Sequence, residues 1–287
     1  MRFLIGLVLL GVLGAAAGLW VTRPQPVAPE AFAALTGDAG AGERVFYAAG
    51  CASCHTAPES DDATSLPGGK RFATQFGTFI APNISTSESE GIGGWTLAQF
   101  ASAVTRGVSP DGAHYYPAFP YTTYAKMLDQ DVADLWAYME TLPAVEVPSQ
   151  PHEVGFPFSI RASLGGWKLL NLSDDFVMPE ETPGRYLVEA LGHCAECHTP
   201  RDITGGLDLS SWMAGAPLPV GDGRVPGLTP DELEWSESDI AYYLETGFTP
   251  DFDSAGGEMV DVIKNTAKLT PEDRAALAAY VKALPAP

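Results

Sequence analysis

The sequence predicts an all-α fold made of two copies of one small domain behind an apolar N-terminal segment. Internal repeats and helical periodicity carry this prediction. Residues 42–56 resemble residues 184–199. Residues 95–111 match residues 235–251 in the same way. Apolar residues recur at helical spacing within both copies, and no alternation typical of strands competes with them.

Three helices are expected in each copy. The first leads into the repeated cysteine motif. The second begins at Thr96 or Ser236, whose hydroxyls can cap the exposed amides of a helix. It ends at Gly107 or Gly247, because glycine suits the left-handed closing position. The third helix, near the end of each copy, carries apolar residues at helical spacing.

The repeats divide the chain of 287 residues into five parts, which is consistent with about two ordinary domains. These parts are a membrane anchor or signal segment at 1–23, a stalk at 24–36, a first domain at 37–143, a segment between the domains at 144–182, and a second domain at 183–287. The segment between the domains matches neither copy. Because it is too apolar for a free linker, we expect it to pack across both domains.

The N-terminal segment is an uncharged apolar run from Phe3 to Val21. Its length nearly spans a bilayer core of about 30 Å. A secretory signal usually has a shorter apolar region of about 7–15 residues, followed by small residues such as "GAAAG" in this run. The length, and Trp20 at the end where an aromatic belt would lie, favour a retained anchor over cleavage. Either outcome places the remainder outside the cytoplasm.

The charge of the chain limits the kinds of partner that it can have. Its formal net charge is −20, from 16 basic and 36 acidic residues. A general nucleic-acid binder would need a basic face, so the composition excludes that class. The charge favours solubility and basic or dipolar protein partners.

All four cysteines belong to two motifs in which two cysteines are separated by two residues and followed by a histidine. The residues of these motifs are Cys51, Cys54 and His55, and Cys194, Cys197 and His198. This is the attachment pattern of c-type haem. The two thiols add to the two vinyl groups of one porphyrin, and the imidazole that follows binds the iron as proximal ligand. We therefore predict two covalently bound haem c groups.

Other uses of these cysteines fit less well. Paired zinc motifs of this kind lie about 15–20 residues apart, whereas Cys51 and Cys194 are separated by 143 positions. A thioredoxin-like motif, or disulfides between the pairs, would leave the two histidines unexplained.

With these motifs the chain resembles the periplasmic dihaem class I c-type cytochromes, which are related to the cytochrome subunits of bacterial alcohol, gluconate and other membrane-associated dehydrogenases. The resemblance rests also on "FGTFIAPNISTSESEGIGGW", "HYYPAFPY" and "DIAYYLETGFTPDFDSAGGEM", and covers residues 38–285. Subunits of that family often carry three haems, whereas this chain has motifs for two.

The resemblance implies electron transfer from a periplasmic dehydrogenase to a downstream cytochrome, a quinone or a terminal oxidase. It also implies a position on the periplasmic side of the bacterial inner membrane, anchored by the N-terminal helix, or soluble in the periplasm if the signal is cleaved. We expect no catalysis by the protein itself. The alternative is a peroxidase-like haem enzyme, or a small-ligand-binding protein, that uses an open first haem.

The second axial ligand is expected to be Met259 for the second haem, since "GGEM" lies where class I cytochromes place their distal methionine. For the first haem, the position eight residues after Asp111, which corresponds to Met259 after Asp251, is Phe119. Many relatives read "YPAMPY" where this chain reads "YPAFPY".

Because phenylalanine cannot bind iron, three alternatives remain for the first haem. Met127 could bind after a rearrangement of the loop, although its place in the repeat also fits core packing. His114 could bind and give a bis-histidine haem, or the iron could stay five-coordinate beneath Phe119. Of the three, we favour Met127.

Overall fold

The computed structural model describes residues 2–286, and it is mostly helical. The helices before and within the first domain are α1 (Arg2–Val21), α2 (Pro29–Phe32), α3 (Ala39–Ala48), α4 (Cys51–His55), α5 (Leu97–Arg106), α6 (Tyr121–Tyr124) and α7 (Asp129–Met139). Then come α8 (Ser163–Asn171), α9 (Pro183–Tyr186), the π-helix η1 (Leu187–Leu191), α10 (Ala195–His198), the 3₁₀ helix η2 (Leu209–Ser211), α11 (Glu237–Thr246), α12 (Met259–Thr266) and α13 (Pro271–Lys282).

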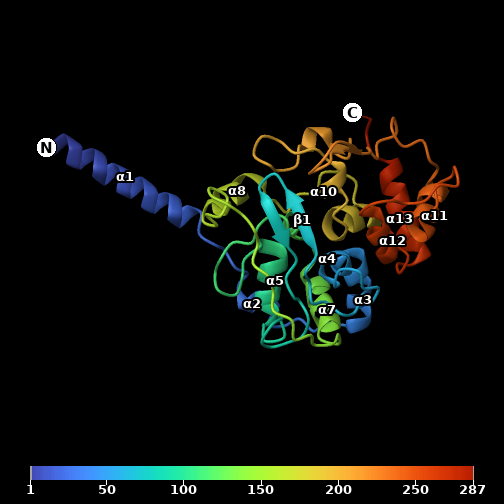
Figure 1. Cartoon of the computed structure of the whole chain (residues 1–287), viewed down its shortest axis with the longest axis horizontal. Coiled ribbons are helices and arrows are strands. Elements are labelled where there is room, and N and C mark those ends of the chain that lie inside the picture. The colour runs from blue at the N-terminus through green and yellow to red at the C-terminus, as the bar shows by residue number, and fades with distance from the viewer. Residues whose placement is uncertain (1, 287) are drawn as a thin grey trace.

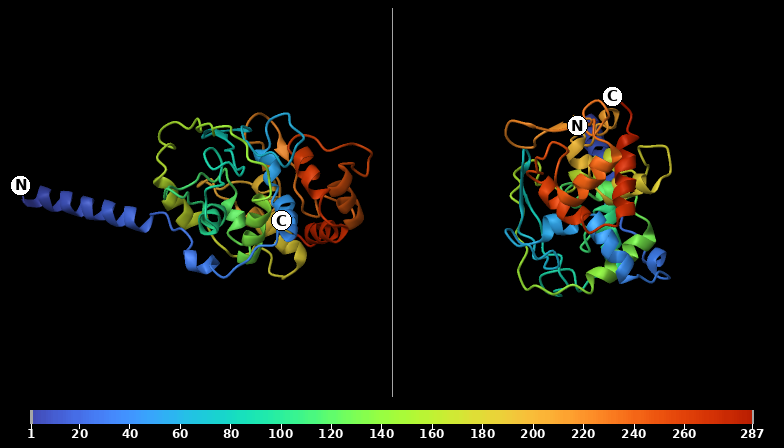
Figure 2. Two further views of the ribbon diagram at one scale, coloured as in Figure 1. Left: turned by 90° about the horizontal axis from the view of Figure 1, so that it is seen from below. Right: turned by 90° about the vertical axis from the view of Figure 1, so that its right-hand side faces the viewer.

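Helix α1 projects from the body of the molecule as a single rod (Figures 1 and 2). Its described large apolar side chains, such as Phe3 and Trp20, are exposed. Among residues 2–286, no helix combines the length and the apolar character required of a membrane span. The structure therefore does not confirm the N-terminal membrane anchor predicted from the sequence.

The predicted ends of the second helix of each copy are confirmed. Thr96 and Ser236 each form a capping box, in which the hydroxyl accepts from the backbone N–H three residues later. Each such cap contributes about 1 kcal/mol. Gly107 and Gly247 close the two helices in the left-handed conformation, with φ of 58° and 78°.

The first and last helices of each domain cross at a glycine. A Cβ at Gly42 of α3 would lie 1.9 Å from the carbonyl oxygen of Asp134 in α7. A Cβ at Gly184 of α9 would lie 2.2 Å from that of Ala276 in α13. Because only glycine permits this approach, the same crossing is built twice, and it brackets the core of each domain.

The two copies differ just before the second cysteine motif. The chain from Gly184 to Cys194 is one residue longer than the chain from Gly42 to Cys51. The structure absorbs the additional residue in the π-helix η1, which follows α9 directly. A one-residue insertion commonly takes this form inside a helix.

Two short antiparallel hairpins modify the predicted all-α fold. Strand β1 (Arg71–Thr74) pairs with β2 (Gly77–Ile80), and β3 (Ala216–Pro217) pairs with β4 (Arg224–Val225). Strands of two to four residues are too short for their alternation to stand out in a sequence. The first hairpin is also held from outside, since Thr78 and Glu153 exchange backbone hydrogen bonds.

The segment between the domains runs along the first domain and touches the second. The Lys168 ammonium donates to the carbonyl oxygens of Arg106 and Gly107, both at 2.7 Å. The indole N–H of Trp167 donates to the carbonyl oxygen of Thr204, at 3.1 Å. Helix α8 therefore lies against the end of α5 and also contacts the loop that follows the second cysteine motif.

Candidate haem sites

Each cysteine motif forms one short helical turn. Helix α4 begins after Gly50, which adopts a left-handed conformation with φ of 66°, and it contains Cys51, Cys54 and His55. Helix α10 holds Cys197 and His198, with Cys194 as its N-cap. No disulfide bond joins any of the four cysteines, all of which lie within the described residues. On one helical turn, two thiols three positions apart lie on the same side as the histidine that follows, which is the arrangement needed to grip one porphyrin edge.

Both motif histidines are fixed by the same kind of hydrogen bond. His55 Nδ1 donates to the carbonyl oxygen of Pro82 at 2.8 Å, and His198 Nδ1 donates to that of Pro226 at 2.7 Å. This bond selects the tautomer whose Nε2 carries the lone pair. Desolvation lowers the pKa of both imidazoles, so both are neutral at pH 7. The two side chains therefore fit the role of proximal iron ligands.

The thiols fit haem attachment better than a zinc site. Desolvation raises the pKa of Cys51 to about 12 and that of Cys194 to about 11, so these thiols are protonated near neutral pH. Within residues 2–286, no three His, Cys, Asp or Glu side chains gather into a site for a separate metal ion.

The two cysteine motifs lie against each other across the domain interface. A Cβ at Gly50 would lie 3.5 Å from His193 Nε2, and one at Gly192 would lie 3.7 Å from the carbonyl oxygen of Ala48. The ring of Tyr124, whose hydroxyl donates to the carbonyl oxygen of Ala49 at 2.7 Å, meets the His193 ring edge-on. The segments that hold the two porphyrins are therefore direct neighbours.

Helix α12 of the second domain packs against α4 and α3 of the first, as Figure 1 shows. Asn265 Nδ2 donates to Ser53 Oγ at 2.8 Å, and this hydroxyl donates to the carbonyl oxygen of Asp261 at 3.3 Å. The Lys70 ammonium bridges Glu258 at 2.7 Å and Asp261 at 2.8 Å. Ser53 lies within the first cysteine motif, so the interface is built on the attachment helix itself.

The structure places Met259 at the start of α12, where it is partly exposed. This helix joins the long loop after α11 to the domain interface. Met259 thus lies on the segment that packs against the first attachment helix. The assignment of Met259 as the distal ligand of the second haem is a prediction from the sequence.

The distal loop of the first domain contains an aromatic cluster. The ring of Phe119 packs against those of Tyr115, Tyr121 and Tyr124, at centroid distances of 6.2, 6.3 and 5.9 Å. Since Tyr124 bonds to Ala49, just before the first cysteine motif, this cluster lies beside the first attachment helix.

The register between the two distal loops changes by two residues. The bridge between Val108 and His114 corresponds to the bridge between Phe248 and Ser254, 140 positions later. However, Gly107 abuts Tyr121 whereas Gly247 abuts Ile263, which lies 142 positions after Tyr121. With the offset of 140 positions found at the bridges, the counterpart of Met259 is Phe119. With the offset of 142 positions found at Tyr121 and Ile263, the counterpart of Met259 is Pro117.

The two other candidates for the first iron have different surroundings. Met127 is 6% exposed in the core, and its repeat counterpart Leu269 is 5% exposed. His114 is buried, with Nε2 2.9 Å from the carbonyl oxygen of Thr22 and with Nδ1 lacking a hydrogen-bond partner. Because Nε2 is engaged by Thr22, which directly follows helix α1, ligation of iron by His114 would require its other nitrogen or the loss of this hydrogen bond.

Sequence reasoning missed the two prolines that orient the histidines. Pro82 follows His55 by 27 residues and Pro226 follows His198 by 28, so their matched positions in the repeat were an available signal. Every residue type carries a backbone carbonyl, so the identity of a residue does not indicate that its carbonyl oxygen accepts a hydrogen bond from a histidine.

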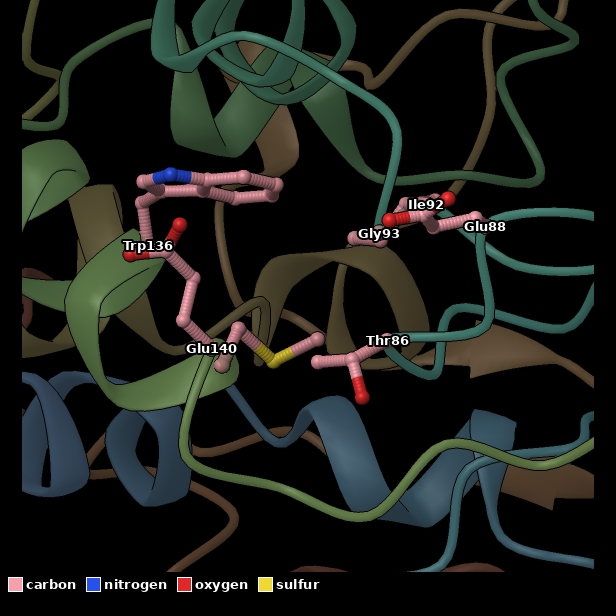
Figure 3. Close-up of a pocket in the computed structure, with 7 residues that line it drawn as sticks. Thr86, Glu88, Ile92, Gly93, Trp136 and Glu140 are labelled. Carbon is pink, nitrogen blue, oxygen red and sulfur yellow. The ribbon is translucent and has the colours of Figure 1, made fainter.

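A small pocket between α7 and the loop 86–93 is separate from both motifs (Figure 3). Its volume is about 190 Å³, and its lining includes Trp136 and Met139 of α7 and Glu140, which caps this helix. Ligand pockets typically exceed about 300 Å³, and this one is lined by neither cysteine nor histidine. It is therefore not assigned to haem.

Comparisons with known proteins agree with this geometry. The cytochrome c family matches residues 39–143 and 182–285. A diheme cytochrome c-type protein of Cereibacter sphaeroides is 54% identical over 98% of this chain and 97% of its own length. The fructose dehydrogenase cytochrome subunit of Gluconobacter japonicus is 37% identical, over 92% of this chain and 56% of its own length.

A third relative is the cytochrome c subunit of the quinone alcohol dehydrogenase of Gluconacetobacter polyoxogenes, which is 35% identical over 82% of this chain and 53% of its own length. The chain thus spans about half the length of the two dehydrogenase subunits. It belongs to the cytochrome c family, and it is a dihaem member with two covalently bound haem c groups.

Proposed function

We propose that the protein relays electrons from a periplasmic dehydrogenase to a downstream cytochrome, quinone or terminal oxidase. The contact between the two cysteine motifs carries this proposal, since it brings the two attachment segments together across the interface. Relatives that are cytochrome subunits of fructose and alcohol dehydrogenases support a dehydrogenase as the electron donor.

Haem supplies one-electron redox chemistry when bound, and the chain holds and tunes it. The four cysteines tether the two macrocycles, and His55 and His198 provide proximal nitrogens. The carbonyl oxygens of Pro82 and Pro226 accept the Nδ1 protons. This bond orients each ring and raises the basicity of Nε2. A rigid ligand changes little between oxidation states, which suits rapid transfer.

We propose Met259 as the distal ligand of the second haem and Met127 as the ligand available to the first. A thioether ligand raises the reduction potential. Replacement of Met259 on one loop by Phe119 on the other supports a functional difference between the two irons. The matched burial of Met127 and Leu269 also fits core packing, and the Met127→Leu variant distinguishes the two roles.

A rapid-mixing experiment tests the relay. The oxidised protein is mixed with less than one equivalent of a one-electron reductant, and each haem band is followed with time. The expected result is fast reduction of one haem, followed by a first-order transfer to the other that does not depend on protein concentration. Transfer that scales with protein concentration would mean that electrons do not pass within the molecule.

Phe119 in the distal slot supports one second function, a small-ligand or peroxidase-like reaction at an open first haem. Mixing the reduced protein with carbon monoxide separates the two functions. Rapid binding of carbon monoxide at one haem would favour an open first haem. If carbon monoxide does not bind rapidly at either haem, the enzyme function is excluded and electron relay remains.

We also propose that residues 1–23 direct export, so that the two domains operate in the periplasm, and that they hold the protein at the membrane if they are retained. The exposed apolar side chains of α1 support this proposal. N-terminal sequencing of the protein purified from its host, together with its distribution between membrane and periplasmic fractions, tests it. An intact N-terminus found only in the periplasmic fraction would contradict anchoring.

A further inference from the structure

Helix α11 and the loop that follows it expose an aromatic groove on the second domain. Its residues are Asp239, Tyr242, Phe248, Thr249, Pro250 and Phe252, which surround a volume of about 520 Å³. We call this surface the α11 groove. Phe248 is 52% exposed and Phe252 is 96% exposed. Adjacent exposed aromatic side chains are typical of interaction sites on soluble proteins.

The corresponding surface of the first domain is covered by the chain itself. The backbone N–H of Val27, in the stalk, donates to Ser102 Oγ at 3.0 Å, and Lys168 of α8 binds the carbonyl oxygen of Gly107 at 2.7 Å. Beside these contacts, Val108 is only 1% exposed. The positions that correspond in the two copies are Ser102 and Tyr242, Val108 and Phe248, and Gly112 and Phe252.

Phe252 is an unusual residue at its position. It adopts a left-handed backbone conformation with φ of 64°, and its counterpart Gly112 adopts the same conformation with φ of 73°. Glycine takes this conformation without strain, whereas a bulky side chain does not. The second domain thus carries a strained, almost fully exposed aromatic residue where its repeat has glycine. Neither the strain nor the exposure helps the fold, which points to a role in binding.

The charge around the groove defines its partner. Residues 225–263 contain ten Asp and Glu but no Lys or Arg. Four of the ten, Glu232, Glu245, Glu258 and Asp261, pair with basic residues elsewhere in the chain, which leaves six. Asp239 lines the groove, and Asp251 lies between Pro250 and Phe252 in its wall. Opposite charges accelerate and orient protein association. A second copy of this chain, with a net charge of −20, and an anionic membrane would both be repelled.

We propose that the α11 groove docks a redox partner protein that presents a small apolar surface ringed by lysine or arginine. This inference rests on the proposed electron-transfer function. Tyr242, Phe248 and Phe252 provide the apolar centre of the contact, and the surrounding carboxylates provide its rim. The arrangement matches protein interfaces in general, which have an aromatic core and a polar rim.

Electron transfer between the full-length dihaem protein and a small basic cytochrome c, whose haem edge is surrounded by lysines, tests the proposal. Asp251→Lys is compared with Asp111→Lys, which makes the same charge change at the corresponding position of the first domain. Asp251→Lys is expected to lower the second-order rate constant about tenfold at low salt, and Asp111→Lys to leave it within about twofold. Equal effects of the two variants would overturn the proposal.

Phe252→Gly tests the apolar centre of the contact. The fold should tolerate this change, because the corresponding residue of the first domain is Gly112, which has the same backbone conformation. The variant is expected to lower the rate constant about tenfold while its denaturation midpoint is equal to or above that of the wild type. Phe156→Ser, which changes an 84% exposed aromatic residue outside the groove, is the control. A rate constant for Phe252→Gly equal to that of Phe156→Ser would overturn the proposal.

Further measurements separate this inference from the proposed function and from other occupants. If the wild-type haems cycle reversibly with small mediators but the groove variants react like the controls, the docking inference fails while the relay stands. If the haems do not cycle, the relay fails. A wild-type dimer abolished by Phe252→Gly, or binding to anionic vesicles abolished by it, would also overturn the proposal in favour of that occupant.

Discussion

Prolyl carbonyl oxygens hold both motif histidines in the same tautomer and orientation. The bonds from His55 to Pro82 and from His198 to Pro226 are nearly equal in length. A difference in potential between the two haems must therefore come from elsewhere. The distal loops are the natural source, since Phe119 and Met259 give them different chemistry.

Substitution of the proposed sulfur ligands tests this difference. Met259→Leu removes a thioether while keeping an apolar side chain, so the potential of one haem should fall by a sizeable part of the about 0.8 V range that axial ligands command. Potentiometric titration followed at both haem bands measures the change. An unchanged pair of potentials would show that Met259 does not bind iron.

Met127→Leu is the companion variant for the first haem. If Met127 binds, the sulfur-dependent absorption band of one haem disappears and its potential falls. If Met127 only packs in the core, as its counterpart Leu269 does, the spectrum stays the same, because leucine and methionine have similar volumes. An unchanged spectrum would therefore contradict ligation by Met127.

Phe252→Gly should stabilise the second domain. Left-handed backbone conformation costs a non-glycine residue about 1–2 kcal/mol, and part of this gain is offset by the greater freedom of glycine in the unfolded chain. We expect a free energy of unfolding higher by about 0.5–1 kcal/mol, measured by chemical denaturation. Lower stability would mean that the exposed ring packs on the fold.

Most of the motif residues could be assigned from the sequence, because covalent haem attachment imposes a fixed spacing on residue types. The distal side of the first haem could not. Its loop differs in register from that of the second domain by two residues, and the structure places this shift between His114 and Tyr121, because Tyr121 and Ile263 occupy the same place beside their glycines.

At the scale of helices, the crossing of α3 with α7 tolerates no side chain at Gly42. A Cβ there would meet the backbone oxygen of Asp134 at 1.9 Å, so the helices would have to separate. Gly42→Ala should destabilise the first domain by about 3 kcal/mol or more, or prevent its folding. Chemical denaturation, or the haem content of the purified protein if little folds, measures the loss.

Gly166→Ala is the matched control. Gly166 lies inside α8, and a Cβ there would meet no atom within 4 Å. Because alanine is a better helix former than glycine, this variant should be more stable by about 0.5–1 kcal/mol. Destabilisation by both variants would show that the close approach of α3 and α7 is not what makes Gly42 necessary.

Helix boundaries were predictable where side chains carry the signal, as the capping hydroxyls of Thr96 and Ser236 do. The β1–β2 hairpin and the π-helix η1 were not. The hairpin is held by backbone hydrogen bonds between Thr78 and Glu153, which is distant in the sequence. The π-helix η1 accommodates one inserted residue, and a single insertion changes neither the composition nor the hydrophobic periodicity of the segment enough to be detected.

At the scale of the whole molecule, an ion pair between α3 and α13 joins the two domains, in addition to the bridge made by Lys70. Arg44 of α3 donates to both carboxylate oxygens of Asp273 in α13, at 2.9 and 2.7 Å. The hydrogen bond to Arg44 lowers the pKa of Asp273 from its usual value of 3.8. Its stabilising effect is therefore fully present above about pH 4 and is lost as the pH falls through the lowered pKa.

Asp273→Asn removes this pH dependence. Near pH 7 the variant should be less stable than the wild type by about 1 kcal/mol, since Arg44 is partly exposed and screened by solvent. The difference between the two proteins should shrink as the pH falls below 4. Chemical denaturation at several pH values measures it. A difference that stays constant down to pH 2 would contradict the assignment.

The contact between the cysteine motifs has a consequence for how the protein is made. Gly50 and Gly192 lie where the two motif segments meet, so docking of the domains covers part of the chain beside Cys51 and Cys194. An enzyme that forms thioether bonds would reach both motifs more readily before docking. The biogenesis of this protein is therefore expected to run in a fixed order, in which cofactor attachment comes first and the two halves join afterwards.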